Sequence, residues 1–118
     1  MIDRLDVLIA PISDAVKTSR TSFERARVSG VAPATAVARF AAWSKPLREQ
    51  RATFIARPAA FDWPWIAQYA WRYLGDNPFG FNAVCASSWF EGRGRTFKVN
   101  LPHVAGEDAE IQLRHFLA

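Results

Sequence analysis

The spacing of apolar positions divides the chain into a helical first part and a shorter β-like part near its carboxyl end. Apolar residues recur every three or four positions from Ile2 to Val16, which is the spacing of one face of an α-helix. Pro11 interrupts this stripe, because proline has no N–H to bond the carbonyl of Val7. The pattern therefore predicts one kinked or split helix over residues 2–19.

Capping and breaking residues predict three further helices before residue 60. Thr21 and Glu24 fit a capping box, and Gly30 can end the helix that follows. Pro33 can open an alanine-rich helix, and Ser44 ahead of Pro46 repeats the arrangement of a cap followed by a proline. The expected helices cover residues 21–28, 33–43 and 46–56.

The next segment, residues 61–81, is the most aromatic part of the chain and holds 8 of its 16 aromatic residues. At 100° per residue, a helix that ends at Gly75 would have one narrow polar strip, formed by Pro64, Gln68 and Arg72 and flanked by Trp65 and Trp71. A helix that is apolar on nearly every other side normally packs in a core. The residues at its edges fit either a core or an interface: they are Trp63, Trp65, Phe79 and Phe81.

The period of the pattern changes to two near residue 83. Two β-like runs are separated by the sequence EGRG, which predicts a β-hairpin over residues 83–101. A helix over 107–117 should follow, because its acidic residues come first and Arg114 and His115 come last, in the order that complements a helix dipole. An isolated hairpin is marginally stable, so it must pack on the helices or pair with another strand, and this leaves a homodimer open.

These elements predict a single α+β domain over residues 1–118. The expected fold is mostly helical, with about five to six short helices and one C-terminal β-hairpin or small antiparallel sheet packed on them. The expected divisions are a helical part over 2–75, the hairpin over 83–101 and the last helix over 107–117. The length of 118 residues and the 22% of charged residues are typical of one globular domain.

The composition also bears on the compartment. The single cysteine, Cys85, excludes an intramolecular disulfide framework and indicates a reducing environment. No run reaches the roughly 18 apolar residues that a membrane helix needs. The first residues lack the cationic start and apolar run of a signal peptide. We therefore expect a cytoplasmic protein without membrane contacts.

The charges are unevenly distributed. Residues 17–57 contain nine basic residues and two acidic ones, a net charge of +7, whereas the whole chain carries +4 and the remainder therefore −3. A one-sided basic segment favours phosphate backbones or acidic protein surfaces as partners. Arg93 and Arg95, in the expected hairpin turn, add a second basic group. The candidate nucleic-acid-binding residues are Arg25, Arg27, Lys45, Arg48, Arg51, Arg93 and Arg95.

The sequence shows no recognisable catalytic set. His103 and His115 lack the spacing of zinc ligands, and phosphate-binding glycine loops are absent from the sequence. The acidic residues near Glu107 are explained by the dipole of the last helix. Cys85 fits a buried core position, since unpaired cysteine is among the most buried residue types. The expectation is a protein that is not an enzyme, with neither a metal nor a cofactor.

Two functional hypotheses follow. The first is a small non-enzymatic binding protein whose basic helical surface engages nucleic acid or a nucleic-acid-processing complex. The alternative is a protein–protein inhibitor or adaptor, for example one encoded by a phage or plasmid and acting on a host system. Its partner-binding residues would be Trp63, Trp65, Trp71 and Trp89, because tryptophan is enriched at the centres of interfaces.

Overall fold

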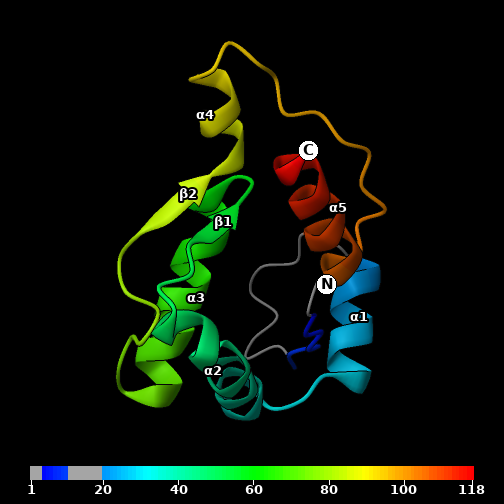
Figure 1. Cartoon of the computed structure of the whole chain (residues 1–118). Helices are drawn as coiled ribbons and strands as arrows, with labels where there is room; N and C mark the ends of the chain where they lie inside the picture. Colours follow the sequence, from blue (N-terminus) through cyan, green and yellow to red (C-terminus); the bar gives the residue numbers. More distant parts are fainter. Residues whose placement is uncertain (1–3, 11–19) are drawn as a thin grey trace.

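The structure, a computed structural model, describes residues 4–10 and 20–118. Within these residues, five helices and two short strands form a mixed helix and strand fold (Figure 1). No helix among these residues is long and apolar enough to cross a membrane. In chain order the elements are α1 (Arg20–Ser29), α2 (Pro33–Glu49), β1 (Phe54–Ala56), α3 (Ala59–Leu74), β2 (Ala83–Cys85), α4 (Ala86–Glu91) and α5 (Ala105–Leu117).

The two strands pair in parallel, and α3 connects them. Phe54 lies opposite Ala83, and Ala56 lies opposite Cys85. Parallel strands cannot be joined by a tight turn and need a crossover connection, which is normally a helix. The predicted hairpin over 83–101 is therefore wrong: its first run leaves the extended conformation after Cys85 and forms α4, and its second run, residues 95–101, is irregular.

Helix α2 is continuous, although the sequence predicts two helices there. Pro33 occupies its first turn as expected, but Pro46 lies inside the helix and does not end it. The helix ends instead where Arg51 adopts a left-handed conformation, with a φ of 58°. Glycine usually occupies that conformation, so the sequence carried no stop signal. The predicted helix over 46–56 is wrong in its second half, which contains β1.

The three remaining described helices agree with the sequence patterns. Helix α1 covers the predicted 21–28, and α5 covers the predicted 107–117. Helix α3 begins at Ala59, before the expected start, and ends as predicted at Gly75, whose φ is 70°. Local capping and stop signals were sufficient for these elements.

The segment before α1 is not helical where it is described. Residues 4–10 contain no helix, and Ile9 forms a parallel bridge with Val31 through two backbone hydrogen bonds: Ala10 N donates to the Val31 oxygen at 2.8 Å, and Val31 N donates to the Leu8 oxygen at 2.7 Å. Gly30 is needed there because a Cβ atom would collide with the backbone of Ile9 and Ala10. The helix predicted over 2–19 is therefore wrong for residues 4–10, and its portion over 11–19 lies outside the described residues.

The buried core is small and aromatic. Phe90 on α4 and Phe97 after it are 2% and 3% exposed, and their rings meet edge to face at 4.9 Å. Phe116 of α5 stacks on Phe90 at 6.1 Å. The segment that was expected to be a strand thus contributes Phe97 to a cluster between α4 and α5. The apolar residues Phe97 and Val99 of this segment pack on the cluster while Lys98 is exposed, so the alternation reflects burial and not strand pairing.

Replacing Phe90 with alanine should lower the free energy of unfolding by about 3–5 kcal/mol, because a buried aromatic ring is removed and a cavity remains. Urea unfolding measured by circular dichroism tests this. Phe61→Ala is the control, since Phe61 is 60% exposed and its loss should change stability by less than about 1 kcal/mol. Equal losses in the two variants would contradict this description of the core.

Candidate functional site

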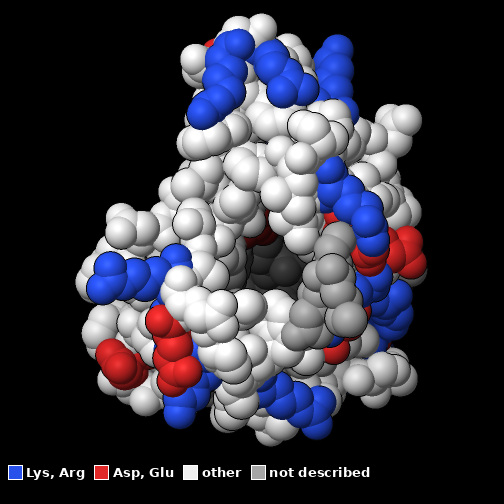
Figure 2. All heavy atoms as spheres, viewed as in Figure 1, with Lys and Arg blue, Asp and Glu red and all other residues white. Residues whose placement is uncertain are grey.

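A central cavity of about 650 Å³ opens between α2, the first half of α3 and α5. Figure 2 shows the hollow in the middle of this face of the molecule. Its volume lies within the range of ligand sites, about 300–1,000 Å³. Aromatic side chains from four parts of the chain contribute to its lining: they are Phe40, Trp43, Phe54, Trp63, Phe79 and Phe81.

Arg48 is a cation of this lining that is held by neutral groups. Its Nε donates to the Ser44 hydroxyl at 3.1 Å, and its Nη2 donates to the Ala41 carbonyl oxygen at 2.9 Å. The guanidinium also lies 5.4 Å from the centre of the Phe79 ring. Both hydrogen-bond acceptors are neutral, so these contacts fix the guanidinium without compensating its charge.

Arg51 and Phe81 are two exposed residues of the cavity lining. Arg51 is exposed, and its left-handed backbone turns the chain from α2 toward β1. Phe81 is 84% exposed although it is a large apolar side chain. Trp63 is more enclosed and packs against Phe54, with ring centres 5.0 Å apart. The cavity lining thus combines an exposed aromatic ring and an exposed arginine with enclosed aromatic rings.

The α5 wall of the cavity has its charges paired. Glu110 accepts from Arg4 at 3.1 Å and from Arg114 at 2.9 Å. Hydrogen bonds from Arg114 and then from Arg4 lower the pKa of the Glu110 carboxyl. Because this carboxylate is paired with two cations, it does not offset the charges of Arg48 and Arg51. The α2 wall therefore has a positive character.

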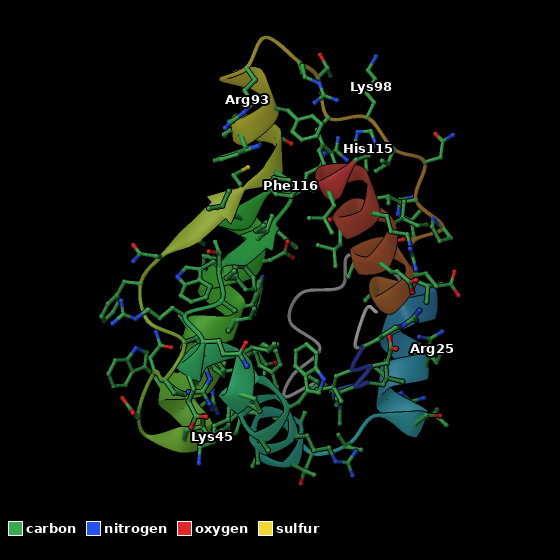
Figure 3. The ribbon with its side chains drawn as sticks, viewed as in Figure 1. Arg25, Lys45, Arg93, Lys98, His115 and Phe116 are labelled. Carbon is green, nitrogen blue, oxygen red and sulfur yellow. The ribbon has the colours of Figure 1, made fainter. Side chains whose placement is uncertain are left out.

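The other predicted basic residues lie elsewhere. Arg27 pairs with Glu24 at 2.8 Å on α1, and Arg25 is exposed on the same helix. Lys45 projects from α2 (Figure 3) but is not part of the cavity lining. Of the seven predicted nucleic-acid-binding residues, the cavity brings together Arg48 and Arg51.

Arg93 and Arg95 do not form a hairpin tip. They follow α4, where the Arg93 guanidinium lies 3.5 Å from the Trp89 ring centre and that of Arg95 lies 4.7 Å from the Phe90 ring centre. Figure 2 shows basic side chains gathered at this upper end of the molecule. The two arginines therefore form a basic group separate from the central cavity.

The four predicted partner-binding tryptophans occupy three places. Trp63 lines the cavity. Trp65 and Trp71 are 50% and 54% exposed along the outer side of α3, and Trp89 is 42% exposed on α4. Packing in a core does not account for the three exposed rings.

Two acidic residues that the sequence did not single out have unusual surroundings. Asp62 lies in the first turn of α3, and burial raises the pKa of its carboxyl. Asp108 accepts the backbone N–H of His103 at 3.1 Å, and His103 has a left-handed φ of 62°. Perturbed carboxyl groups and unusual backbone conformations are concentrated at functional sites.

Asp62 also occupies a favourable place in the fold. It follows the carboxyl end of β1, and in open sheets of parallel strands ligands bind beyond the carboxyl ends of the strands. The sequence could not reveal this, because the raised pKa arises from tertiary burial. In the described part of the chain, histidine, cysteine, aspartate and glutamate form no group of three or more that could hold a metal ion.

Cys85 ends β2 and is partly exposed, which differs from the expected core position. Its sulfur accepts backbone hydrogen bonds from Ser88 first and Ala59 second, and these bonds lower the pKa of the thiol to about 7. The two N–H groups come from the first turns of α4 and α3, which meet beyond the parallel strands. Backbone N–H donors therefore favour the thiolate form of Cys85 at the carboxyl end of β2.

Comparison with known proteins gives one informative relationship. The chain is 33% identical over 91 residues to the 3′-5′ DNA exonuclease Cap18 of Escherichia coli, an alignment that covers 71% of this chain and 49% of that protein. The chain thus spans about half the length of this curated relative. No family model matches the chain, and no solved structure matches it significantly.

This similarity contradicts the expectation that the protein is not an enzyme. That expectation rested on the absence of recognisable catalytic spacing, whereas a relative that matches most of this chain is an exonuclease. A catalytic set that is assembled from distant segments leaves no compact motif, so the absence of such a motif was weak evidence.

Alkylation of Cys85 by iodoacetamide should show a midpoint near pH 7, because only the thiolate reacts and its backbone donors favour it. The rate should rise as the pH increases through that value. Rates measured by mass spectrometry between pH 5 and 10 test this, with free cysteine, whose pKa is about 8.5, as the control. A midpoint equal to that of free cysteine would contradict the described hydrogen bonds.

Proposed function

We propose that this protein acts on DNA as a 3′–5′ exonuclease or as part of one. The observation that carries the proposal is the 33% identity to a 3′-5′ DNA exonuclease over 71% of the chain. The positive, aromatic central cavity supports a nucleic-acid substrate independently of that similarity. The hypothesis of nucleic-acid engagement is thereby retained, now with hydrolysis in place of binding alone.

The central cavity is suited to the end of a single DNA strand. Proteins that bind single strands combine a positive groove with aromatic rings on which bases stack. Here Phe81 offers an exposed ring in the same cavity lining as Arg51, and Arg48 supplies a second charge in a fixed position. A base would stack on Phe81 while the arginines contact its phosphates.

The chemistry requires a water molecule to attack phosphorus while the bond from phosphorus to the 3′ oxygen of the preceding nucleotide breaks. The products are a nucleoside 5′-monophosphate and a strand shortened by one nucleotide. A carboxylate with a raised pKa is a suitable acceptor for the proton of that water. We assign this role to Asp62, whose carboxyl pKa is raised by burial and which directly precedes Trp63 of the cavity lining in the first turn of α3.

Protein binding is a second candidate function, which one observation favours. Phe61, Trp65 and Trp71 are each at least 50% exposed along the outer side of α3. Exposed aromatic surfaces of this kind mark interaction sites. This aromatic face lies outside the cavity lining, so a protein partner and a DNA strand could be bound together.

The protein should shorten 5′-labelled single-stranded DNA from its 3′ end, and Asp62→Asn should lower that rate by roughly 10²–10⁴-fold, because the proton acceptor is lost. Denaturing gel electrophoresis follows the products. The control is Asp76→Asn, the same change at an exposed aspartate just beyond the other end of α3, which should retain the natural rate.

Two results would count against these assignments. If the natural chain releases no nucleotides under any divalent-ion condition, the chain is not an exonuclease by itself. If Asp62→Asn cleaves at the natural rate, another group accepts the proton.

Arg51→Gln and Phe81→Ala should each weaken binding of a single-stranded oligonucleotide roughly tenfold, since a charged contact or a stacked base is lost. Fluorescence anisotropy at several salt concentrations measures this, and Arg51→Gln should also reduce the salt dependence. Arg39→Gln removes an exposed charge from α2, the helix that precedes Arg51, outside the cavity lining and should bind nearly normally.

The double variant Trp65→Ala/Trp71→Ala separates the two candidate surfaces. It should bind DNA as the natural chain does, because it changes only the aromatic face of α3. Weakened DNA binding in this variant, with natural affinity in Arg51→Gln, would move the DNA site from the cavity to that face. Sedimentation velocity of the same variant reports whether the face also joins two copies of the chain.

A further inference from the structure

A second, smaller cavity lies beyond the carboxyl end of β1. Its volume is about 340 Å³, and its lining consists of Arg57, Lys98, Val99 and Asn100. Arg57 comes directly after β1, whereas the other three residues belong to the irregular segment between α4 and α5. Figure 3 shows Lys98 on that segment, near the C-terminal end of α5. We call this cavity the Arg57 pocket.

Arg57 is half-buried and held in place by neutral groups. Its Nε donates to the Ser87 hydroxyl at 3.2 Å. Its guanidinium lies 5.4 Å from the ring centre of Phe97, which is itself 3% exposed. These contacts orient the charged group without an acidic partner, and among the described residues no carboxylate forms an ion pair with it.

The rest of the pocket adds positive and polar groups. Lys98 contributes a second cation from an exposed position, and Asn100 contributes an amide that can donate hydrogen bonds. The lining contains no acidic residue. The first turn of α3 follows Arg57 by two residues, and the positive end of its helix dipole adds to the same potential.

A partly desolvated cation without a counter-ion is unfavourable by itself and favours an anion in the space beside it. The guanidinium fork matches the oxygens of a phosphate, and a lysine and an amide complete a polar cradle. A carboxylate ligand would satisfy fewer of these donors, because it has two oxygens where a phosphate has three or four. The chemistry therefore fits a phosphate group.

We propose that the Arg57 pocket binds a phosphate group, at a position distinct from the central cavity. The phosphate belongs either to the backbone of a nucleic acid or to a free nucleoside monophosphate, and both present the same charged oxygens. The site goes beyond the proposed exonuclease activity, because it needs neither Asp62 nor the aromatic cavity. It would persist if the chain proved to have no nuclease activity.

The test follows backbone amide NMR signals during separate titrations with sodium phosphate, deoxyadenosine 5′-monophosphate, deoxyadenosine and a short oligothymidylate. Sodium chloride at matched ionic strength corrects for screening. We expect phosphate and the monophosphate to shift the signals of Arg57, Ser87, Lys98 and Asn100, and deoxyadenosine to leave them unchanged. Oligothymidylate titrations use Asp62→Asn so that the strand stays intact.

Lys98→Gln is the informative variant, because Lys98 is exposed and its removal leaves the Arg57 contacts intact. It should raise the dissociation constant for phosphate roughly tenfold, as expected for the loss of one charge-assisted hydrogen bond. Arg72→Gln, which removes an exposed charge from α3 outside both cavity linings, should change it less than about twofold. Thermal unfolding of both variants reports that they are folded.

The order of affinities identifies the source of the phosphate. Tighter binding of oligothymidylate than of the monophosphate, weakened by Lys98→Gln, assigns the pocket to a nucleic-acid backbone; the reverse order assigns it to a free nucleotide. Either result supports a phosphate site. The proposal is overturned if phosphate shifts none of the four signals, if deoxyadenosine shifts them equally, or if Lys98→Gln binds phosphate like the natural chain.

Discussion

The parallel pairing of β1 with β2 is the constraint on which the rest of the structure depends. Three residue pairs join segments that lie on either side of α3 in the sequence. Because both strands point the same way, their carboxyl ends meet at one edge, and the residues that follow each strand are brought together there. Arg57 therefore reaches Ser87 at 3.2 Å across 30 positions of sequence.

Several unusual groups are concentrated at this edge. Asp62 has a raised carboxyl pKa in the first turn of α3, and Cys85 has a lowered thiol pKa at the end of β2. Burial causes the first shift and backbone hydrogen bonds cause the second, so the two groups experience different environments although one strand pair positions both. The central cavity and the Arg57 pocket also each include residues of β1 or its immediate neighbour.

The sequence predicted those elements whose signals are local. Thr21 with Glu24 indicated α1, Gly75 indicated the end of α3, and the order of charges indicated α5. It failed where structure depends on distant partners or on an unusual residue. Arg51 ends α2 without a glycine, and β1 is only three residues long. The alternation around Phe97 is typical of a strand, but that side chain packs into the cluster between α4 and α5 without a ladder.

The candidate sites, like the elements, were predictable from the sequence only in part. The sequence singled out Arg48, Arg51 and Trp63, yet it assigned them to two rival surfaces, whereas all three line one cavity. Asp62 and Arg57 had no sequence signal, because their significance comes from burial and from the strand pair. The residue types were therefore foreseeable, but their grouping required the fold.

The way in which Arg48 is held has a consequence for ligand affinity. A free arginine side chain samples many rotamers and loses up to about 2 kcal/mol of conformational entropy when a ligand immobilises it. Ser44, the Ala41 carbonyl and the Phe79 ring already restrict this side chain within the folded protein. Most of its ordering cost is thus incurred during folding, and an anion that enters the cavity meets a preorganised charge.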